Sequence, residues 1–150
     1  MSEKGRFSVR PISGNYAQME TQRTVRYEGS CHCGAVRFSF DGMIDQVREC
    51  DCSVCKRHGA LTFRVERDAL SFSPPLDELT EYLWGTRTGA DYFCPKCGIL
   101  QFRRPSQPTR QEQANGLKPF DGWAVNVRCI DELDLESLPR VRIEGSKIAF

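Results

Sequence analysis

Apolar and polar residues alternate along much of the chain, with the two-residue period of strands that bury one face. The clearest runs are 36–40, 61–65 and 123–129. Shorter apolar stretches predict further strands at 70–72, 79–84, 99–102, 141–143 and 148–150. No segment carries a sustained 3.6-residue period. The pattern therefore predicts a mainly β fold.

Three segments fall outside this pattern. Residues 1–25 are polar and have few apolar side chains, which predicts a flexible N-terminal extension and leaves 26–150 as a single domain. Residues 130–138 predict one helical turn. Residues 103–122 are rich in Pro and Gly and predict a long loop, which either covers a site or is a disordered insertion.

The charge balance is nearly neutral, since Lys and Arg number 21 and Asp and Glu number 20. This balance provides no overall field toward nucleic acid or an anionic membrane, so we expect neither as a partner, and any recognition of anions must be local. The chain lacks the apolar core of a secretory signal and any run of roughly 20 apolar residues. We therefore expect a cytoplasmic protein, whose thiols stay reduced.

Seven of the eight cysteines lie in three tight clusters. The clusters are Cys31-His32-Cys33, the segment 50–55 and Cys94-Pro95-Lys96-Cys97. Thiolates one or two residues apart can converge on one ion at about 2.3 Å, whereas ring strain makes them poor disulfide partners. In a reducing compartment the clusters therefore indicate metal sites, and their number implies two ions per chain.

The clusters can be paired in two ways. Joining the 52–55 pair to the 94–97 pair gives an ordinary zinc ribbon but leaves three cysteines unexplained. Joining Cys31 and Cys33 to the 94–97 pair uses every clustered cysteine and leaves a second set of Cys50, Cys52 and Cys55. On a strand, residues two apart project to the same side, so Cys31 and Cys33 could share an ion while His32 points away.

The two sets of the second pairing predict different chemistry. A closed site of four thiolates has no free position and holds a fold together, whereas three protein ligands leave a fourth position for water or substrate, as in catalytic zinc. A thiol is a natural fourth ligand, because zinc would hold it as a nucleophilic thiolate near neutral pH. We therefore expect the set of Cys50, Cys52 and Cys55 to be catalytic.

Three segments together resemble a known family. They are GSCHCGAVRF at 29–38, CDCSVCKR at 50–57 and FCPKCG at 93–98. In order and spacing they resemble the glutathione-dependent formaldehyde-activating family, which includes the centromere protein V domain, over roughly Tyr27 to Cys129. The resemblance implies a β-tent fold of antiparallel sheets around a structural zinc on Cys31, Cys33, Cys94 and Cys97. It implies a second zinc on Cys50, Cys52 and Cys55.

The resemblance also implies the reaction of the family. There the thiol of glutathione adds to formaldehyde and forms S-hydroxymethylglutathione, which is carbon–sulfur lyase chemistry. The implied partners of this chain are a small thiol, such as glutathione, and formaldehyde or another small aldehyde.

Basic residues close to the second set are candidates for binding an acidic thiol. Lys56 and Arg57 directly follow Cys55, so either could hold a carboxylate by charge-assisted hydrogen bonds, unless they form a solvated basic pair. His58 is a fourth zinc ligand, a general base or an ordinary surface histidine. Weaker candidates for the carboxylate are Arg37, Arg87, Arg103 and Arg104.

Two other functions stay open. One is a non-catalytic zinc module that contacts protein or nucleic acid. The other uses the eighth cysteine, Cys129, as a redox thiol, as in methionine sulfoxide reductases of related β-tent architecture. Because Cys129 is in phase with the apolar residues of 123–127, we expect it instead to be a buried packing residue.

Overall fold

Strands form the framework of the computed structural model, which describes residues 24–147. A three-stranded sheet has the order β1-β2-β5, and a seven-stranded sheet has the order β10-β3-β4-β9-β8-β7-β6. The predicted mainly β fold is confirmed. The strand bounds are β1 Val25–Ser30, β2 Arg37–Gly42, β3 Val47–Cys50, β4 Thr62–Glu66, β5 Ser71–Ser73, β6 Thr80–Tyr82, β7 Ala90–Phe93, β8 Leu100–Arg104, β9 Gly122–Asn126 and β10 Arg140–Ile143. The predicted strand at 148–150 and nearly all of the predicted extension at 1–25 lie outside the described residues.

Within residues 24–147, every strand pair is antiparallel except β10 with β3. The implied β-tent of antiparallel sheets therefore contains one parallel pair at an edge. The connection after β9 returns the chain to the start of β3, where the Val47 N–H donates to the Pro139 carbonyl (3.0 Å). β10 then runs in the same direction as its neighbour, from Arg140 beside Val47 to Ile143 beside Cys50.

The alternating runs at 36–40 and 61–65 form β2 and β4, and most of their apolar side chains are buried. The run at 123–129 forms a strand only as far as Asn126, so this prediction is wrong at its C-terminal end. The Asn126 side chain accepts a hydrogen bond from the Arg128 N–H (3.2 Å) and caps the 3-10 helix η3 (Val127–Cys129). The shorter predicted strands at 70–72, 79–84, 99–102 and 141–143 overlap β5, β6, β8 and β10.

Several short elements were not predicted. Alternation missed β1, β3 and β7, and it missed the helix α3 (Ser53–His58) because six residues are too few to display a helical period. The 103–122 segment contains a second helix, α4 (Arg110–Ala114). The turn predicted in 130–138 is the 3-10 helix η4 (Leu135–Ser137). None of the helices within 24–147 is long and apolar enough to cross a membrane.

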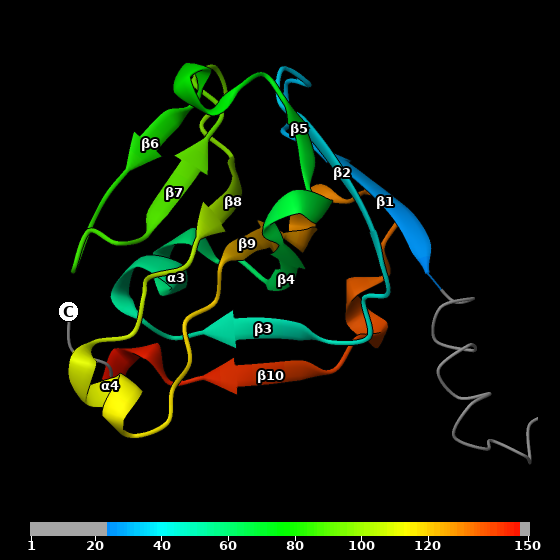
Figure 1. Cartoon of the computed structure of the whole chain (residues 1–150). Helices are drawn as coiled ribbons and strands as arrows, with labels where there is room; N and C mark the ends of the chain where they lie inside the picture. Colours follow the sequence, from blue (N-terminus) through cyan, green and yellow to red (C-terminus); the bar gives the residue numbers. More distant parts are fainter. Residues whose placement is uncertain (1–23, 148–150) are drawn as a thin grey trace, which may run out of the picture.

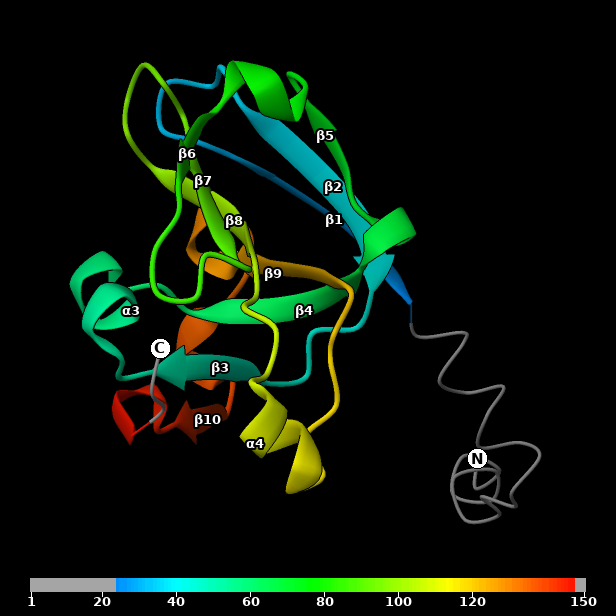
Figure 2. The same cartoon turned by 60° about the vertical axis from the view of Figure 1, so that its left-hand side comes forward.

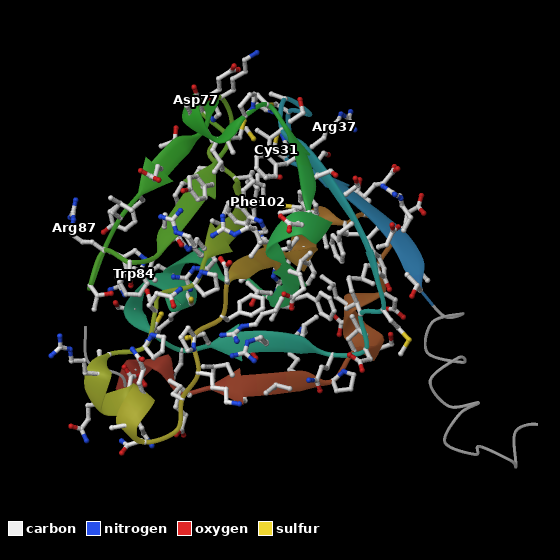
Figure 3. All side chains as sticks on the ribbon, viewed as in Figure 1. Cys31, Arg37, Asp77, Trp84, Arg87 and Phe102 are labelled. Carbon is white, nitrogen blue, oxygen red and sulfur yellow. The ribbon has the colours of Figure 1, made fainter. Side chains whose placement is uncertain are left out.

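The two sheets incline toward each other like the sides of a tent (Figure 1). They meet through aromatic side chains: Phe72 of β5 packs on Phe102 of β8 with ring centroids 4.9 Å apart, and Phe102 contacts Trp123 of β9 at 5.2 Å (Figure 3). Helices α3 and α4 lie on the side of the seven-stranded sheet away from the three-stranded sheet (Figure 2). The large sheet therefore has one face on the core and another that is available to form a site.

Candidate metal centres and the adjoining cavity

Four cysteines from two turns converge, and Cys31 of this group lies near the end where the sheets meet (Figure 3). This four-cysteine cluster comprises Cys31, Cys33, Cys94 and Cys97, whose Sγ atoms all lie within 4.8 Å of one another. The Cys31–Cys33 and Cys33–Cys94 sulfur separations are both 3.6 Å. Sulfur ligands about 2.3 Å from a tetrahedral zinc ion are themselves about 3.8 Å apart, so this spacing fits such an ion.

The turn at 94–98 directs backbone N–H groups at sulfur atoms of this cluster. Lys96 and Cys97 donate to the Sγ of Cys94 at 3.3 and 3.4 Å. The backbone N–H groups of Cys33 and Ile99 lower the pKa of the Cys97 thiol to about 6. Such donation favours the thiolate, which is the form of cysteine that binds metal.

Cys31 and Cys33 lie in a turn, not on the regular strand that we assumed to bring them together. The Gly34 N–H donates to the Cys31 carbonyl (3.2 Å), and Gly34 has a left-handed φ of 83°. The Val36 N–H donates to the Cys31 Sγ (3.3 Å). The two thiols therefore converge because the chain folds back between them, and His32 between them is exposed.

The three-cysteine cluster comprises Cys50, Cys52 and Cys55, whose Sγ atoms also lie within 4.8 Å of one another. Cys50 ends β3, Cys52 is the N-cap of α3, and Cys55 lies in the first turn of that helix. The Cys52 N–H points at Cys50 Sγ (3.5 Å) and the Cys55 N–H at Cys52 Sγ (3.4 Å). A hydrogen bond from Cys55 lowers the pKa of Cys50 to about 5. The clustered cysteines thus fall into the predicted groups of four and three, both consistent with zinc sites.

Glycine at position 145 lets the chain after β10 approach the three-cysteine cluster. A Cβ on Gly145 would collide with the Cys50 Sγ and lie 2.9 Å from the Cys52 Cβ. The next residue is fixed by the Ser146 N–H, which donates to the Asp51 carboxylate (2.9 Å). The close packing against Cys50 therefore requires a residue without a side chain.

Arg103 of β8 places a cation beside the three-cysteine cluster. Its Nη1 donates to the Cys55 Sγ (3.3 Å), and its Nε donates to the fully buried carboxylate of Asp91 on β7 (2.8 Å). The guanidinium also lies over the Trp84 ring, 5.5 Å from its centroid. Three contacts therefore orient this guanidinium toward the sulfur atoms.

A cavity of about 320 Å³ adjoins the three-cysteine cluster. Cys50, Cys52 and Cys55 all line it, whereas no residue of the four-cysteine cluster does. One wall is the outer face of the large sheet, which presents Arg48, Thr62, Arg64, Arg103, Ala124 and Ile143. The three-cysteine cluster is therefore the one that faces a cavity large enough for a small ligand.

The segment 105–120 forms another wall of this cavity. Its start is fixed by the Gln107 N–H, which donates to the Thr88 hydroxyl (3.0 Å). Its helix α4 begins with a capping box, in which Thr109 and Glu112 satisfy each other's backbone N–H groups. Of the two interpretations of 103–122, the structure therefore supports the one in which the segment covers a site.

Comparison with known proteins agrees with this geometry. Residues 26–118 match the family described as glutathione-dependent formaldehyde-activating enzyme. The chain belongs to this glutathione-dependent formaldehyde-activating (GFA) family. A crystal structure of a Rhodobacter sphaeroides protein is 32% identical to it and has a TM-score of 0.58, with 76% of this chain and 99% of that chain covered. The GFA match ends at Lys118, before the Cys129 at which the resemblance was expected to end.

Not all the basic residues singled out in this GFA chain reach the cavity. Lys56 and Arg57 are exposed on α3 and do not line it, and Arg57 donates instead to the Ser53 carbonyl (3.0 Å). Arg37 and Arg87 lie at opposite outer edges of the molecule (Figure 3). Arg104 donates to the Tyr92 hydroxyl (3.3 Å), and only Arg103 of the weaker candidates lines the cavity.

His58 lies outside the three-cysteine cluster. Its Nδ1 is 4.0 Å from the Asp91 carboxylate, and its ring packs edge-on against Phe93 with centroids 5.3 Å apart. Burial lowers the pKa of His58, which keeps the ring neutral over more of the physiological range. The contacts place this histidine behind Asp91 and not on the cavity wall.

Cys129 is buried in the core of this GFA chain, as the alternation indicated. Its thiol donates to the Leu100 carbonyl (3.5 Å) and receives a weak contact from the Gln101 side-chain amide (3.7 Å). Burial raises the pKa of Cys129 to about 12. A redox thiol needs exposure and an accessible thiolate, so this environment favours the packing role.

Replacing Gly145 with valine should release metal from the three-cysteine cluster alone. The added side chain would occupy the space of the Cys50 Sγ and displace that ligand. The expected result is about one fewer zinc ion per chain by mass spectrometry, with a cooperative melting transition retained. Gly42→Ala serves as a control, because it also alters a glycine but a Cβ there makes only ordinary contacts, the nearest at 3.7 Å from the Phe40 ring. Equal zinc content in the Gly145 variant and the wild type would contradict the packing argument.

Proposed function

We propose that this chain is a zinc-dependent enzyme of the carbon–sulfur lyase type, which reversibly adds a small thiol, such as glutathione, to formaldehyde or another small aldehyde. The observation that carries the proposal is that the three-cysteine cluster lines a cavity while the four-cysteine cluster does not. A volume of about 320 Å³ falls in the range of small-ligand sites. Membership of the GFA family supplies the reaction class.

The two clusters would hold zinc for different purposes. Cys31, Cys33, Cys94 and Cys97 provide a complete tetrahedral set and would brace the turns at the junction of the sheets. Cys50, Cys52 and Cys55 provide three ligands, and a zinc ion there would supply an open position that favours the thiolate form of a bound thiol. This assignment gives two zinc ions per chain.

The residues around the three-cysteine cluster would bind and orient the reactants. In the reaction a bond forms between the thiol sulfur and the aldehyde carbon, the carbonyl π bond breaks, and the thiol proton ends on the new hydroxyl oxygen. The cavity walls hold both reactants together, which reduces the entropic cost of their encounter. The Arg103 guanidinium, fixed by Asp91, faces the negative charge of the cluster and of a thiolate beside it.

An exchange experiment tests the reaction directly. Two-dimensional exchange NMR with ¹³C-labelled formaldehyde and glutathione measures the rate at which S-hydroxymethylglutathione forms and dissociates. The wild-type protein should accelerate this exchange over buffer. Cys52→Ser should lower the accelerated rate by at least about 100-fold, because replacing a residue that merely supports a metal ligand already lowers activity by up to about 100-fold.

Cys129→Ser is the matched control, because it removes a buried cysteine that belongs to neither cluster. It should keep the wild-type rate. No acceleration by zinc-loaded wild-type protein with any of several small thiols would contradict the enzymatic proposal and favour the non-catalytic zinc module. Loss of activity in Cys129→Ser alone would favour thiol redox chemistry.

A further inference from the structure

Two arginines in the cavity have no acidic partner in the part of the chain that the structure describes. Arg48 of β3 lies opposite Thr62 of β4, and Arg64 follows Thr62 by two positions, so both arginines belong to the same face of the sheet. Within residues 24–147, no carboxylate lies within ion-pair distance of either guanidinium. Arg103, the third arginine of this face, is neutralised by Asp91.

The protein holds these two like charges near each other. Burial, and then the charge of Arg48, lower the pKa of Arg64. Arg64 also lies over the Phe120 ring, 4.7 Å from its centroid. Phe120 fits there because residue 122 is glycine, where a Cβ would come within 2.6 Å of the ring. A stacked guanidinium keeps its in-plane N–H donors free for a ligand.

The carboxylate of the cavity does not neutralise the two arginines. Lys118 adds another cation to the lining, and among the described residues Glu112 is the single carboxylate in it. The Glu112 Oε2 already accepts hydrogen bonds from the Thr109 N–H (3.0 Å) and hydroxyl (2.7 Å). The wall around Arg48 and Arg64 is therefore positive.

The arginines lie within reach of the three-cysteine cluster. Arg48 and Cys50 are two residues apart on β3, so their side chains share a face and their Cα atoms are about 7 Å apart. A small thiol with an anionic group a few bonds from its sulfur can therefore contact both. Formaldehyde has no charge, so the positively charged wall would bind the thiol and not the aldehyde.

We propose that Arg48 and Arg64 form an anion-binding subsite, which takes a carboxylate or phosphate group of the ligand that reaches the three-cysteine cluster. The inference deepens the proposed function, because that ligand is its thiol substrate. Planar guanidinium groups bind such anions through paired N–H donors, and the phenyl ring of Phe120 fixes the orientation of one of them. The subsite selects acidic thiols over neutral ones of the same size.

Calorimetric titration of the zinc-loaded full-length protein with S-methylglutathione tests the subsite. This probe carries carboxylates but no free thiol, so binding is measured without turnover. We expect Arg48→Gln and Arg64→Gln each to raise Kd about tenfold, as for the loss of one charge-assisted contact. The diethyl ester of the probe should bind the wild type at least tenfold more weakly than the acid. Arg26→Gln is the control, because Arg26 lies on the other sheet and pairs with Asp41 (3.1 Å).

Competition distinguishes the two kinds of anion. Displacement of the probe by inorganic phosphate more strongly than by acetate assigns the subsite to phosphates, the reverse assigns it to carboxylates, and either result supports the subsite. Equal Kd values for the acid in wild type, Arg48→Gln and Arg64→Gln, or equal binding of acid and ester by the wild type, would overturn it. If the protein is inactive but its affinity for the probe depends on the two arginines, only the proposed reaction is refuted. If the protein is active but its affinity for the probe does not depend on them, only the subsite is refuted.

Discussion

Replacing Cys94 with serine is expected to remove the cooperative unfolding transition of the protein. Cys94 is 1% exposed, receives two backbone N–H donations and lies 3.6 Å from Cys33 within the four-cysteine cluster. Structural zinc contributes about 10–16 kcal/mol in small zinc domains. That is comparable with the whole stability of an ordinary domain, roughly 5–15 kcal/mol. Circular dichroism during heating, together with zinc content, measures the loss.

Cys129→Ser is the matched control for this experiment. It also changes a buried cysteine, but the serine hydroxyl can still donate to the Leu100 carbonyl as the thiol does. We expect it to keep a cooperative transition and two zinc ions per chain. A chelator should abolish the wild-type transition as Cys94→Ser does. Cooperative melting of Cys94→Ser at the wild-type temperature would show that the four-cysteine cluster does not stabilise the fold through metal.

The elements that alternation predicted are those whose two faces differ clearly in polarity. In β2, Phe38 and Phe40 are buried while the residues between them are not, and this difference is visible in the sequence. β7 was missed because Ala90-Asp91-Tyr92 is buried on both faces, and the carboxylate of Asp91 is buried against Arg103 of the next strand. When a polar residue is buried because a residue far away in the sequence pairs with it, its neighbours in the sequence do not indicate that it is buried.

The grouping of the cysteines was predictable because their chemistry requires convergence, whatever backbone provides it. The backbone conformation that brings them together was not predicted, because Cys31 and Cys33 converge through a turn where a strand was assumed. Most of the cavity lining could not be predicted from the sequence. Its arginines come from β3, β4 and β8, so only the strand order and register show that Arg48, Arg64 and Arg103 share one wall. The two-residue spacing of Arg48 and Cys50 was the one local signal available.

Sequence proximity to the cysteines was a poor guide to the basic residues that line the cavity. Lys56 and Arg57 follow Cys55 directly, but α3 turns them toward solvent. A helix rotates successive side chains by about 100°, so adjacent residues do not share the direction of Cys55. On the strands, by contrast, a spacing of two preserves direction, and that is how Arg48 stays beside the cysteines.

Replacing Asp91 with asparagine is expected to lower the free energy of unfolding by about 3 kcal/mol, the cost of breaking a buried ion pair. Asp91 is fully buried and accepts from the Arg103 Nε at 2.8 Å, and the Arg103 side chain is 15% exposed. The variant keeps the shape of the side chain but leaves the guanidinium without its counter-charge beside Cys55. Urea unfolding of the zinc-loaded protein measures the change.

Two further variants separate the ion pair from other effects of the substitution. Asp121→Asn breaks the pair of Arg67 and Asp121, which has a similar distance (2.7 Å) but side chains that are 63% and 73% exposed, so it should cost at most about 1 kcal/mol. The double variant Asp91→Asn with Arg103→Met removes both charges and should recover part of the lost stability, because an uncompensated buried charge costs more than an absent pair. Equal losses for Asp91→Asn and Asp121→Asn would mean that solvent reaches the Asp91–Arg103 pair. In that case Arg103 would not be held rigidly against the three-cysteine cluster, and its proposed part in orienting the reactants would fail with it.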